Sequence, residues 1–159
     1  MESTMIIADT DFLSAFLKID KLELVFTALE TKEIVITQAV LDEIKQAPVQ
    51  EKLMQVIHSK DQKVIIREVN EIFSQNFGKG ELESITLAKE TNALLLMNDQ
   101  KAAKFAESEG ITTMDIPIFL LHCKTNKLIS SKESKEIIEL LKEKDYYEFN
   151  EEIKKILLN

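Results

Sequence analysis

The chain has 159 residues, 45% of them hydrophobic, so it is long enough for one domain with a buried core and too short for two of ordinary size. Only three glycines and two prolines, with no repeats or low-complexity tracts, exclude a fibrous or disordered chain. A net charge of −8 disfavours direct binding of nucleic acid through a basic surface, unless the carboxylates gather around cations or an acidic surface docks a basic partner.

Short, nearly continuous apolar runs predict five strands that are buried on both faces. They lie at residues 5–8, 34–36, 64–66, 93–97 and 111–114. The first four recur at intervals of about 30 residues, the length of a strand with its crossover helix and loops. This spacing favours a parallel sheet rather than a series of hairpins.

The segments between these runs have the period of amphipathic helices. Thr37 is expected to cap a helix, and Gly110 to end one that covers residues 101–109. The other expected helices lie at residues 81–90, at residues 133–144 behind a Ser130–Glu133 capping box, and from an Asn150 cap to Leu158. Between the first and second predicted strands, apolar residues at helical spacing form two faces. These faces would pack either into the core or against a second copy of the chain. Their residues are Leu13, Phe16, Leu17, Leu22 and Val25.

Alternating strands and helices predict an α/β fold, a three-layer sandwich in which a central parallel five-stranded sheet is flanked by helices. We expect a single domain over residues 1–159, with residues 130–159 as a C-terminal helical extension packed on it. In such sheets the functional crevice lies at the carboxyl ends of the strands.

No signal peptide or membrane span is recognisable, which predicts a cytoplasmic protein without a membrane partner. The one cysteine, Cys123, lies in an apolar run typical of a buried helix and is expected in the core.

Carboxylates follow four of the five predicted strands. They are Asp9 with Asp11, Glu43, Glu81 and Asp99. Each has a structural alternative as a helix cap, a helix-dipole partner or a solvated charge. Gathered together they would repel one another, so the joint pattern predicts bound cations. Ligation by oxygen alone suits Mg²⁺ or Mn²⁺ rather than zinc, and the two histidines and Cys123 have no ligand spacing.

Other common catalytic motifs are missing. No serine lies in a nucleophile elbow, and no glycine-rich loop would cradle a phosphate. The acidic set is therefore the main candidate site.

Four motifs in order resemble the PIN-domain family. They are residues 9–13 (DTDFL), 40–44 (VLDEI), 80–88 (GELESITLA) and 95–106 (LLMNDQKAAKFA). The closest match is a prokaryotic subgroup with a Gly-Glu pair opening the helix of the third site and an Asp-Asp pair after the fourth strand. The resemblance covers nearly the whole chain, including residues 126–129 before the C-terminal helices.

The resemblance implies a Mg²⁺- or Mn²⁺-dependent ribonuclease, often the toxin of a toxin–antitoxin pair. Carried over by position, the catalytic set is Asp9, Glu43, Glu81 and Asp99, with Asp11 and Asn98 as additional candidates. Asn98 stands where the subgroup has aspartate, Lys104 where arginine is usual, and residues 114–117 (MDIP) replace a Gly-Thr-rich turn.

The implied mechanism is hydrolysis of an RNA phosphodiester by a metal-activated water. Asp9, Glu81 and Asp99 would hold one or two cations, and Glu43 would be an outer ligand or orient the water. Lys101 and Lys104, together with Lys79 and Lys45, would contact RNA phosphates or simply be solvated. The expected partners are RNA, an antitoxin protein and a second copy of the chain.

Three alternatives stay open. Asp9 and Asp11 resemble the nucleophile and acid of a haloacid-dehalogenase-like phosphatase, although Leu13 departs from that motif. A phosphorelay receiver would need an aspartate after the third strand, where Arg67 and Glu68 stand. The third is a PIN-like binding or regulatory module with weakened catalysis, which Asn98 and the acidic surface favour.

Overall fold

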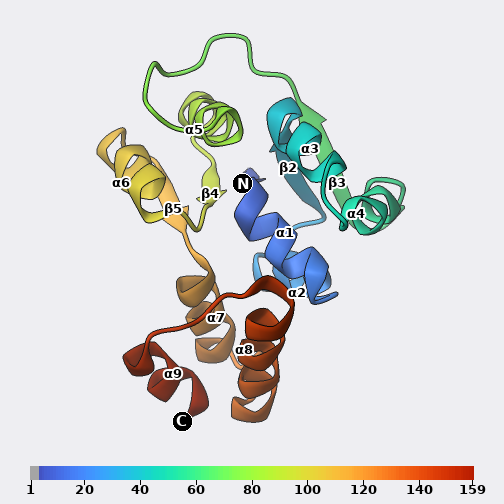
Figure 1. Ribbon diagram of the computed structural model, residues 1–159, viewed down its shortest axis with the longest axis vertical. Coiled ribbons are helices and arrows are strands. Elements are labelled where there is room, and N and C mark those ends of the chain that lie inside the picture. The colour runs from blue at the N-terminus through green and yellow to red at the C-terminus, as the bar shows by residue number, and fades with distance from the viewer. Residues whose placement is uncertain (1–3) are drawn as a thin grey trace.

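A computed structural model describes residues 4–159, and its centre is one parallel sheet with helices on both faces (Figure 1). The strands are β1 (Ile6–Ala8), β2 (Glu33–Thr37), β3 (Lys63–Arg67), β4 (Leu94–Leu96) and β5 (Thr112–Met114). They are ordered β3-β2-β1-β4-β5, and every neighbouring pair is parallel. The predicted α/β class with a five-stranded parallel sheet is confirmed.

Helices connect the strands and continue beyond the last one. They are α1 (Thr10–Lys18), α2 (Leu22–Ala28), α3 (Gln38–Lys45), α4 (Gln50–Ile57), α5 (Lys79–Thr91), α6 (Gln100–Ser108), α7 (Ile116–Thr125), α8 (Ser131–Asp145) and α9 (Glu151–Leu158). Sequence periodicity did not single out α4, whose one fully buried apolar residue is Leu53. Helices α7, α8 and α9 lie together at the lower end of Figure 1.

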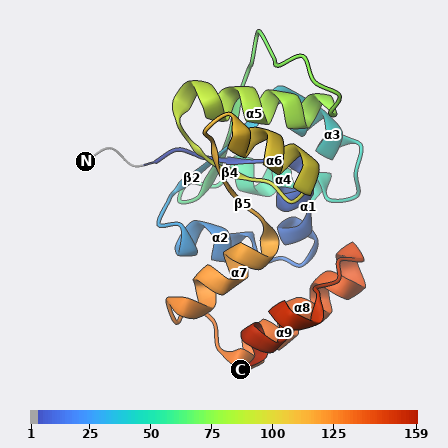
Figure 2. The same cartoon turned by 90° about the vertical axis from the view of Figure 1, so that its left-hand side faces the viewer.

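The side chains of the strands alternate between two apolar clusters, one on each face of the sheet. Ile6 and Ala8 belong to the larger cluster, with side chains of α1–α4 and α7–α9. Ile7 points the other way, into a smaller cluster with side chains of α5 and α6. Figure 2 shows α5 and α6 together on one side of the sheet. The three-layer arrangement therefore follows from continuously apolar strands that need cover on both faces.

Local capping chemistry sets several helix ends as predicted. Thr37 Oγ1 accepts a hydrogen bond from the Val40 amide at 3.3 Å, and Asn150 Oδ1 accepts one from Ile153 at 2.9 Å. Ser130 and Glu133 form a capping box, with hydrogen bonds of 3.1 and 3.3 Å. Gly110 has a φ of +81°, in the left-handed region that favours glycine after a helix.

The apolar faces of the first helices lie in the core. The two faces are those of Leu13, Phe16 and Leu17 in α1 and of Leu22 and Val25 in α2, and all five residues are buried. Phe12, Phe16 and Phe119 pack with ring centroids 5.1 to 5.7 Å apart, which joins α1 to α7. Their burial is explained within one chain, so these faces give no support to a dimer interface.

Cys123 is fully buried in the larger cluster, as predicted, and burial raises the pKa of its thiol to about 12. Within residues 4–159, no helix is both long enough and apolar enough to cross a membrane.

Candidate acidic site

Asp9 is the most buried of the predicted site residues, with 2% of its surface exposed. It follows β1 directly and occupies the N-cap position of α1. Its Oδ1 accepts a hydrogen bond from the Ser84 hydroxyl at 3.4 Å. Burial raises the pKa of Asp9 to about 7, a backbone hydrogen bond from Thr10 lowers it, and the charges of Glu81, Asp11 and Glu43 raise it further. The ionised form of Asp9 therefore lacks compensation by positive charge.

Glu43 reaches the same edge of the sheet from α3, and its side chain is held at both oxygens. The backbone amide of Gly80 donates to Oε1 at 3.3 Å, and the Thr10 hydroxyl donates to Oε2. A Cβ at position 80 would lie 2.7 Å from Oε1. Glycine is therefore required at position 80 for Glu43 to keep this position, which gives a physical reason for the Gly80-Glu81 pair.

Glu81 lies in the first turn of α5, where it accepts a hydrogen bond from the Gly78 amide at 3.1 Å. Partial burial raises the pKa of its carboxyl, the Gly78 bond lowers it, and Asp99, Asp11 and Glu43 raise it. These effects mean that the carboxylates lie within electrostatic range of one another.

Asp99 is exposed at the start of α6, and its Oδ1 accepts a hydrogen bond from the Ala102 amide at 2.9 Å. Asp99 is therefore the N-cap of α6, which was the structural role considered for it from the sequence. Its charge also raises the pKa values of Asp11 and Glu81. The cap does not exclude a second role, because a carboxylate has further lone pairs for other ligands.

Asn98 joins three segments of the chain. Its Oδ1 accepts a hydrogen bond from the Ile116 amide at 3.1 Å, and its side chain also hydrogen-bonds to Tyr147. Burial and Asp115 raise the pKa of that tyrosine, the Asn98 bond lowers it, and Asp145 raises it. An aspartate at position 98 would lack the amide N–H donor and would add a charge near Asp115 and Asp145. Asparagine therefore fits this position better than the aspartate of the resembling subgroup.

Asp11 lies on the exposed side of α1, at the rim of the site. Desolvation raises the pKa of its carboxyl, followed by the charges of Asp145, Asp99 and Glu43, whereas Lys18 lowers it. Asp11 thus links the acidic edge to the end of α8, a proximity that the motif pattern did not predict.

The candidate lysines Lys45, Lys79, Lys101 and Lys104 are all exposed. Lys104 lines a shallow hollow of about 180 Å³ that also includes Asn98, Gln100 and Asp115. Glu107 lines this hollow as well, so two carboxylates outnumber the one positive charge of Lys104 there.

Among residues 4–159, no three histidine, cysteine, aspartate or glutamate side chains form a ready metal-binding group. The hydrogen bonds give a reason, because Glu43, Glu81 and Asp99 each accept from a nearby backbone amide. Oxygen ligands around the buried Asp9 are nevertheless the donor type that Mg²⁺ and Mn²⁺ prefer. The residues fit such an ion chemically, and binding it requires the outer carboxylates to turn toward Asp9.

Several contributors to this site were missed from the sequence. Ser84 and Thr10 bind the carboxylates directly, and buried Glu83 accepts a hydrogen bond from the Ala39 amide at 3.0 Å. Ser84 could have been predicted, because it lies one helical turn after Glu81 and therefore on the same face of the helix. No local pattern predicted that Asp145 and Tyr147 would lie near Asp11 and Asn98.

A family model described as a PIN domain matches residues 5–159. The fold is similar to that of a PilT N-terminus domain protein from the archaeon Sulfolobus solfataricus, with a TM-score of 0.53 and 19% identity over 92% of this chain and 98% of that one. It is also similar to a domain of a functionally unknown protein from Methanocaldococcus jannaschii, with a TM-score of 0.51 and 18% identity over 71% of this chain and 91% of that one. A comparison with curated proteins found no match. At these identities the two structures bear on the fold alone.

Proposed function

Because the chain belongs to the PIN-domain family, whose members are typically nucleases, we propose that it is a metal-dependent endoribonuclease. The observation that carries this proposal is Asp9, a buried carboxyl at the end of the central strand whose pKa is raised by burial and by three neighbouring carboxylates. A divalent cation would offset the repulsion among these groups. The phosphatase alternative using Asp9 and Asp11 gains no support from the family match.

Different residues of the chain would bind the metal, orient the water and bind the RNA phosphates. Asp9, Glu81 and Asp99 would hold Mg²⁺ or Mn²⁺, and Glu43, fixed by Thr10 and Gly80, would orient the attacking water from the rim. When bound, the ion would activate that water and neutralise charge on the scissile phosphate. Lys101 and Lys104 would hold neighbouring phosphates of the RNA.

The packing of the C-terminal helices supports a single domain over the whole chain. Ile137, Leu141 and Leu157 of the C-terminal helices are buried in the same cluster as β1, so residues 130–159 would belong to the catalytic domain. An antitoxin with a basic binding surface would be electrostatically complementary to this chain, whose net charge is −8.

A second candidate is a PIN-like binding module that has lost catalysis. It is favoured by the backbone hydrogen bonds that already engage Glu43, Glu81 and Asp99. Affinity for Mn²⁺ separates the two candidates, because a module that only binds a partner has no need of it.

The first test is titration of Mn²⁺ by calorimetry, together with cleavage of single-stranded RNA, on wild type, Asp9→Asn and Asp99→Asn. We expect Asp9→Asn to bind Mn²⁺ weakly and to cleave RNA at least ~100-fold more slowly, since even outer-sphere partners of metals contribute 10- to 100-fold. Asp42→Asn is the matched control, because Asp42 is exposed beside Glu43 and bonds only within its helix to Gln38 in the described structure. Wild-type protein that binds no Mn²⁺, or equal cleavage by all variants, would contradict the proposal.

A further inference from the structure

A second hollow, of about 260 Å³, is also lined by Asn98 and includes Asp11. Its walls come from three separate parts of the chain. They are Asp11, Ser14 and Lys18 of α1, Asn98 after β4, and Asp145 and Tyr147 at the end of α8. Asp11 belongs to both the hollow and the acidic edge, so a group bound in the hollow would lie beside the proposed cleavage site.

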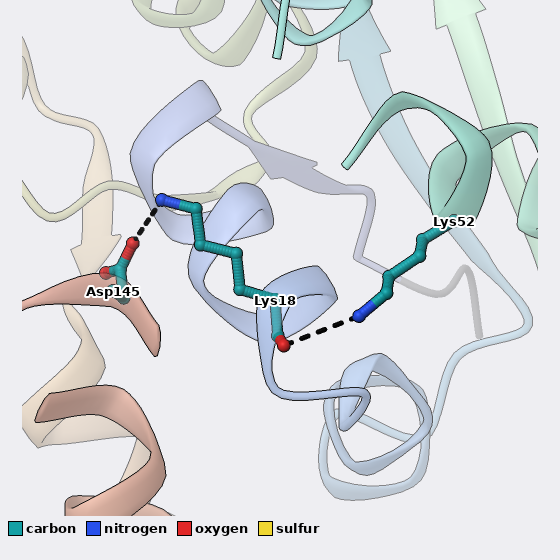
Figure 3. Close-up of polar contacts among 3 residues, drawn as sticks. All are labelled: Lys18, Lys52 and Asp145. Atoms are coloured by element: carbon teal, nitrogen blue, oxygen red, sulfur yellow. Dashed lines mark hydrogen bonds and ion pairs between the residues drawn. The ribbon is translucent and has the colours of Figure 1, made fainter. Parts of the chain in front are cut away.

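The walls of the hollow are held by a contact between two of its own residues and by contacts with residues outside it. Lys18 Nζ and Asp145 Oδ1 form an ion pair at 2.8 Å, with side chains 33% and 18% exposed (Figure 3). The backbone carbonyl of Lys18 accepts a further hydrogen bond from Lys52 at 3.5 Å. The Tyr147 and Phe149 rings pack in a T-shaped arrangement, with centroids 4.9 Å apart. A site held in this way loses little conformational freedom when a ligand binds.

The chemistry of the walls favours a neutral, flat, hydrogen-bonding ligand. Asp11 and Asp145 outweigh the single positive charge of Lys18, so the hollow is a poor site for a phosphate. Tyr147 offers an aromatic surface of the kind on which unpaired bases stack. Carboxylates accept hydrogen bonds from the amino groups of bases, as Asp and Glu do from the N4 amino group of cytosine.

The size of the hollow agrees with a small ligand, since pockets for drug-sized molecules span roughly 300–1,000 Å³. The neighbouring hollow that contains Lys104 also includes Asn98. Both hollows are lined by Asn98, so an RNA strand bound across Asn98 would contact both, with the ring of Tyr147 available to a base.

We propose that the hollow between α1 and Tyr147 binds one unpaired RNA base next to the scissile phosphodiester and prefers a base with an amino group over uracil. This inference rests on the proposed function and deepens it by naming a specificity subsite. Tyr147 stacks on the base, and Asp145, held by Lys18, accepts a hydrogen bond from its amino group.

The test is binding of the labelled RNA pentamers A5, C5 and U5 by fluorescence anisotropy, in EDTA so that cleavage cannot occur. We expect A5 and C5 to bind wild type more tightly than U5. Tyr147→Leu should weaken their binding by roughly 5- to 150-fold, the range for loss of one base–aromatic stack, and should remove the preference over U5. Tyr147→Phe keeps the ring and should bind like wild type.

Tyr146→Asn is the matched control, because Tyr146 is 88% exposed and does not line the hollow. Its φ of +56° is one that asparagine tolerates. Equal affinity of wild type and Tyr147→Leu for A5, or equal loss in Tyr146→Asn, would overturn the subsite.

A second measurement covers the case in which Tyr147→Leu fails to fold. In wild-type protein, titration with cytidine monophosphate should shift the NMR signals of Tyr147 and of the Asn98 amide, and uridine monophosphate should shift them less. Shifts confined to other residues would overturn the proposal.

The two proposals fail in different ways. Binding of A5 through Tyr147 without any RNA cleavage contradicts the nuclease and keeps the subsite. Cleavage with the same base preference in wild type and Tyr147→Leu contradicts the subsite and keeps the nuclease.

Discussion

Asp9 and Glu83 are both buried carboxyl groups at the contact between α5 and the sheet, with 2% and 6% of their surfaces exposed. The region around Glu83 is structural, because this side chain accepts a hydrogen bond of 3.0 Å from the Ala39 amide at the start of α3. Asp9 accepts a 3.4 Å bond from the Ser84 hydroxyl and a backbone hydrogen bond from Thr10, but three further carboxylates lie near it. One carboxylate therefore completes a helix end, and the other is left under-compensated.

This difference separates two reasons for burying a charge. A buried charge that is hydrogen-bonded by a free helix amide links two elements and stabilises the fold. A buried charge with like-charged neighbours destabilises the metal-free fold and persists where a site needs it. The contrast predicts that removing the charge of Asp9 stabilises the metal-free protein at neutral pH and slows cleavage, whereas removing the Glu83 carboxylate destabilises the protein and leaves cleavage unchanged.

The largest expected effect on stability is the pH dependence of the metal-free protein. Burial raises the pKa of Asp9 from 3.8 to about 7, so the folded chain binds more protons than the unfolded chain between these values. The free energy of unfolding should therefore fall as pH rises through this interval, by up to ~4 kcal/mol. Asp11 and Glu81 have raised pKa values as well and add to the same slope.

Urea unfolding in EDTA at several pH values measures this slope. Asp9→Asn should remove most of it, because the amide does not ionise, and added Mn²⁺ should reduce it in wild type. A wild-type stability that rises between these pH values would contradict the electrostatic account of Asp9.

Glu83→Leu should produce the next largest effect, a loss of ~1–3 kcal/mol in the free energy of unfolding, since it leaves the Ala39 amide buried without an acceptor. Glu83→Gln keeps an oxygen acceptor and should recover most of that loss. Cleavage per folded molecule should stay near the wild-type rate in both variants. Loss of cleavage with unchanged stability would show that Glu83 has a functional role like that of Asp9, and it would contradict a structural role for Glu83.

Gly80→Ala should give the smallest effect, and it should fall on activity. The new Cβ would lie 2.7 Å from Glu43 Oε1, so the exposed Glu43 side chain must move away. We expect cleavage to fall about tenfold, as for loss of an outer partner of a metal site, with little change in the melting temperature. In a Glu43→Ala background the same change should have no further effect, and an undiminished effect there would show that Gly80 acts by another route.

The sequence by itself determined the succession of the five strands and the edge of the sheet beside which the candidate carboxylates lie. Apolar runs and caps such as Thr37 and Ser130 act over a few residues, so their outcome can be predicted locally. The observed strand ends differ slightly from the predicted ones. Strands β2 (Glu33–Thr37) and β3 (Lys63–Arg67) are each longer than the apolar runs that predicted them. Helix α4 escaped prediction because its pattern is weak, with Leu53 as its only buried side chain.

Only the tertiary structure decided which acidic residue is buried, which is hydrogen-bonded and what lies beside the site. Asp9, Glu43 and Asp99 have similar local patterns, but only Asp9 is covered, by Ser84 and the start of α5. The approach of Gly80 to Glu43 and of Tyr147 to Asn98 joins segments far apart in the chain. Burial and electrostatics depend on every element packed around a group, so these properties arise only when the distant segments come together.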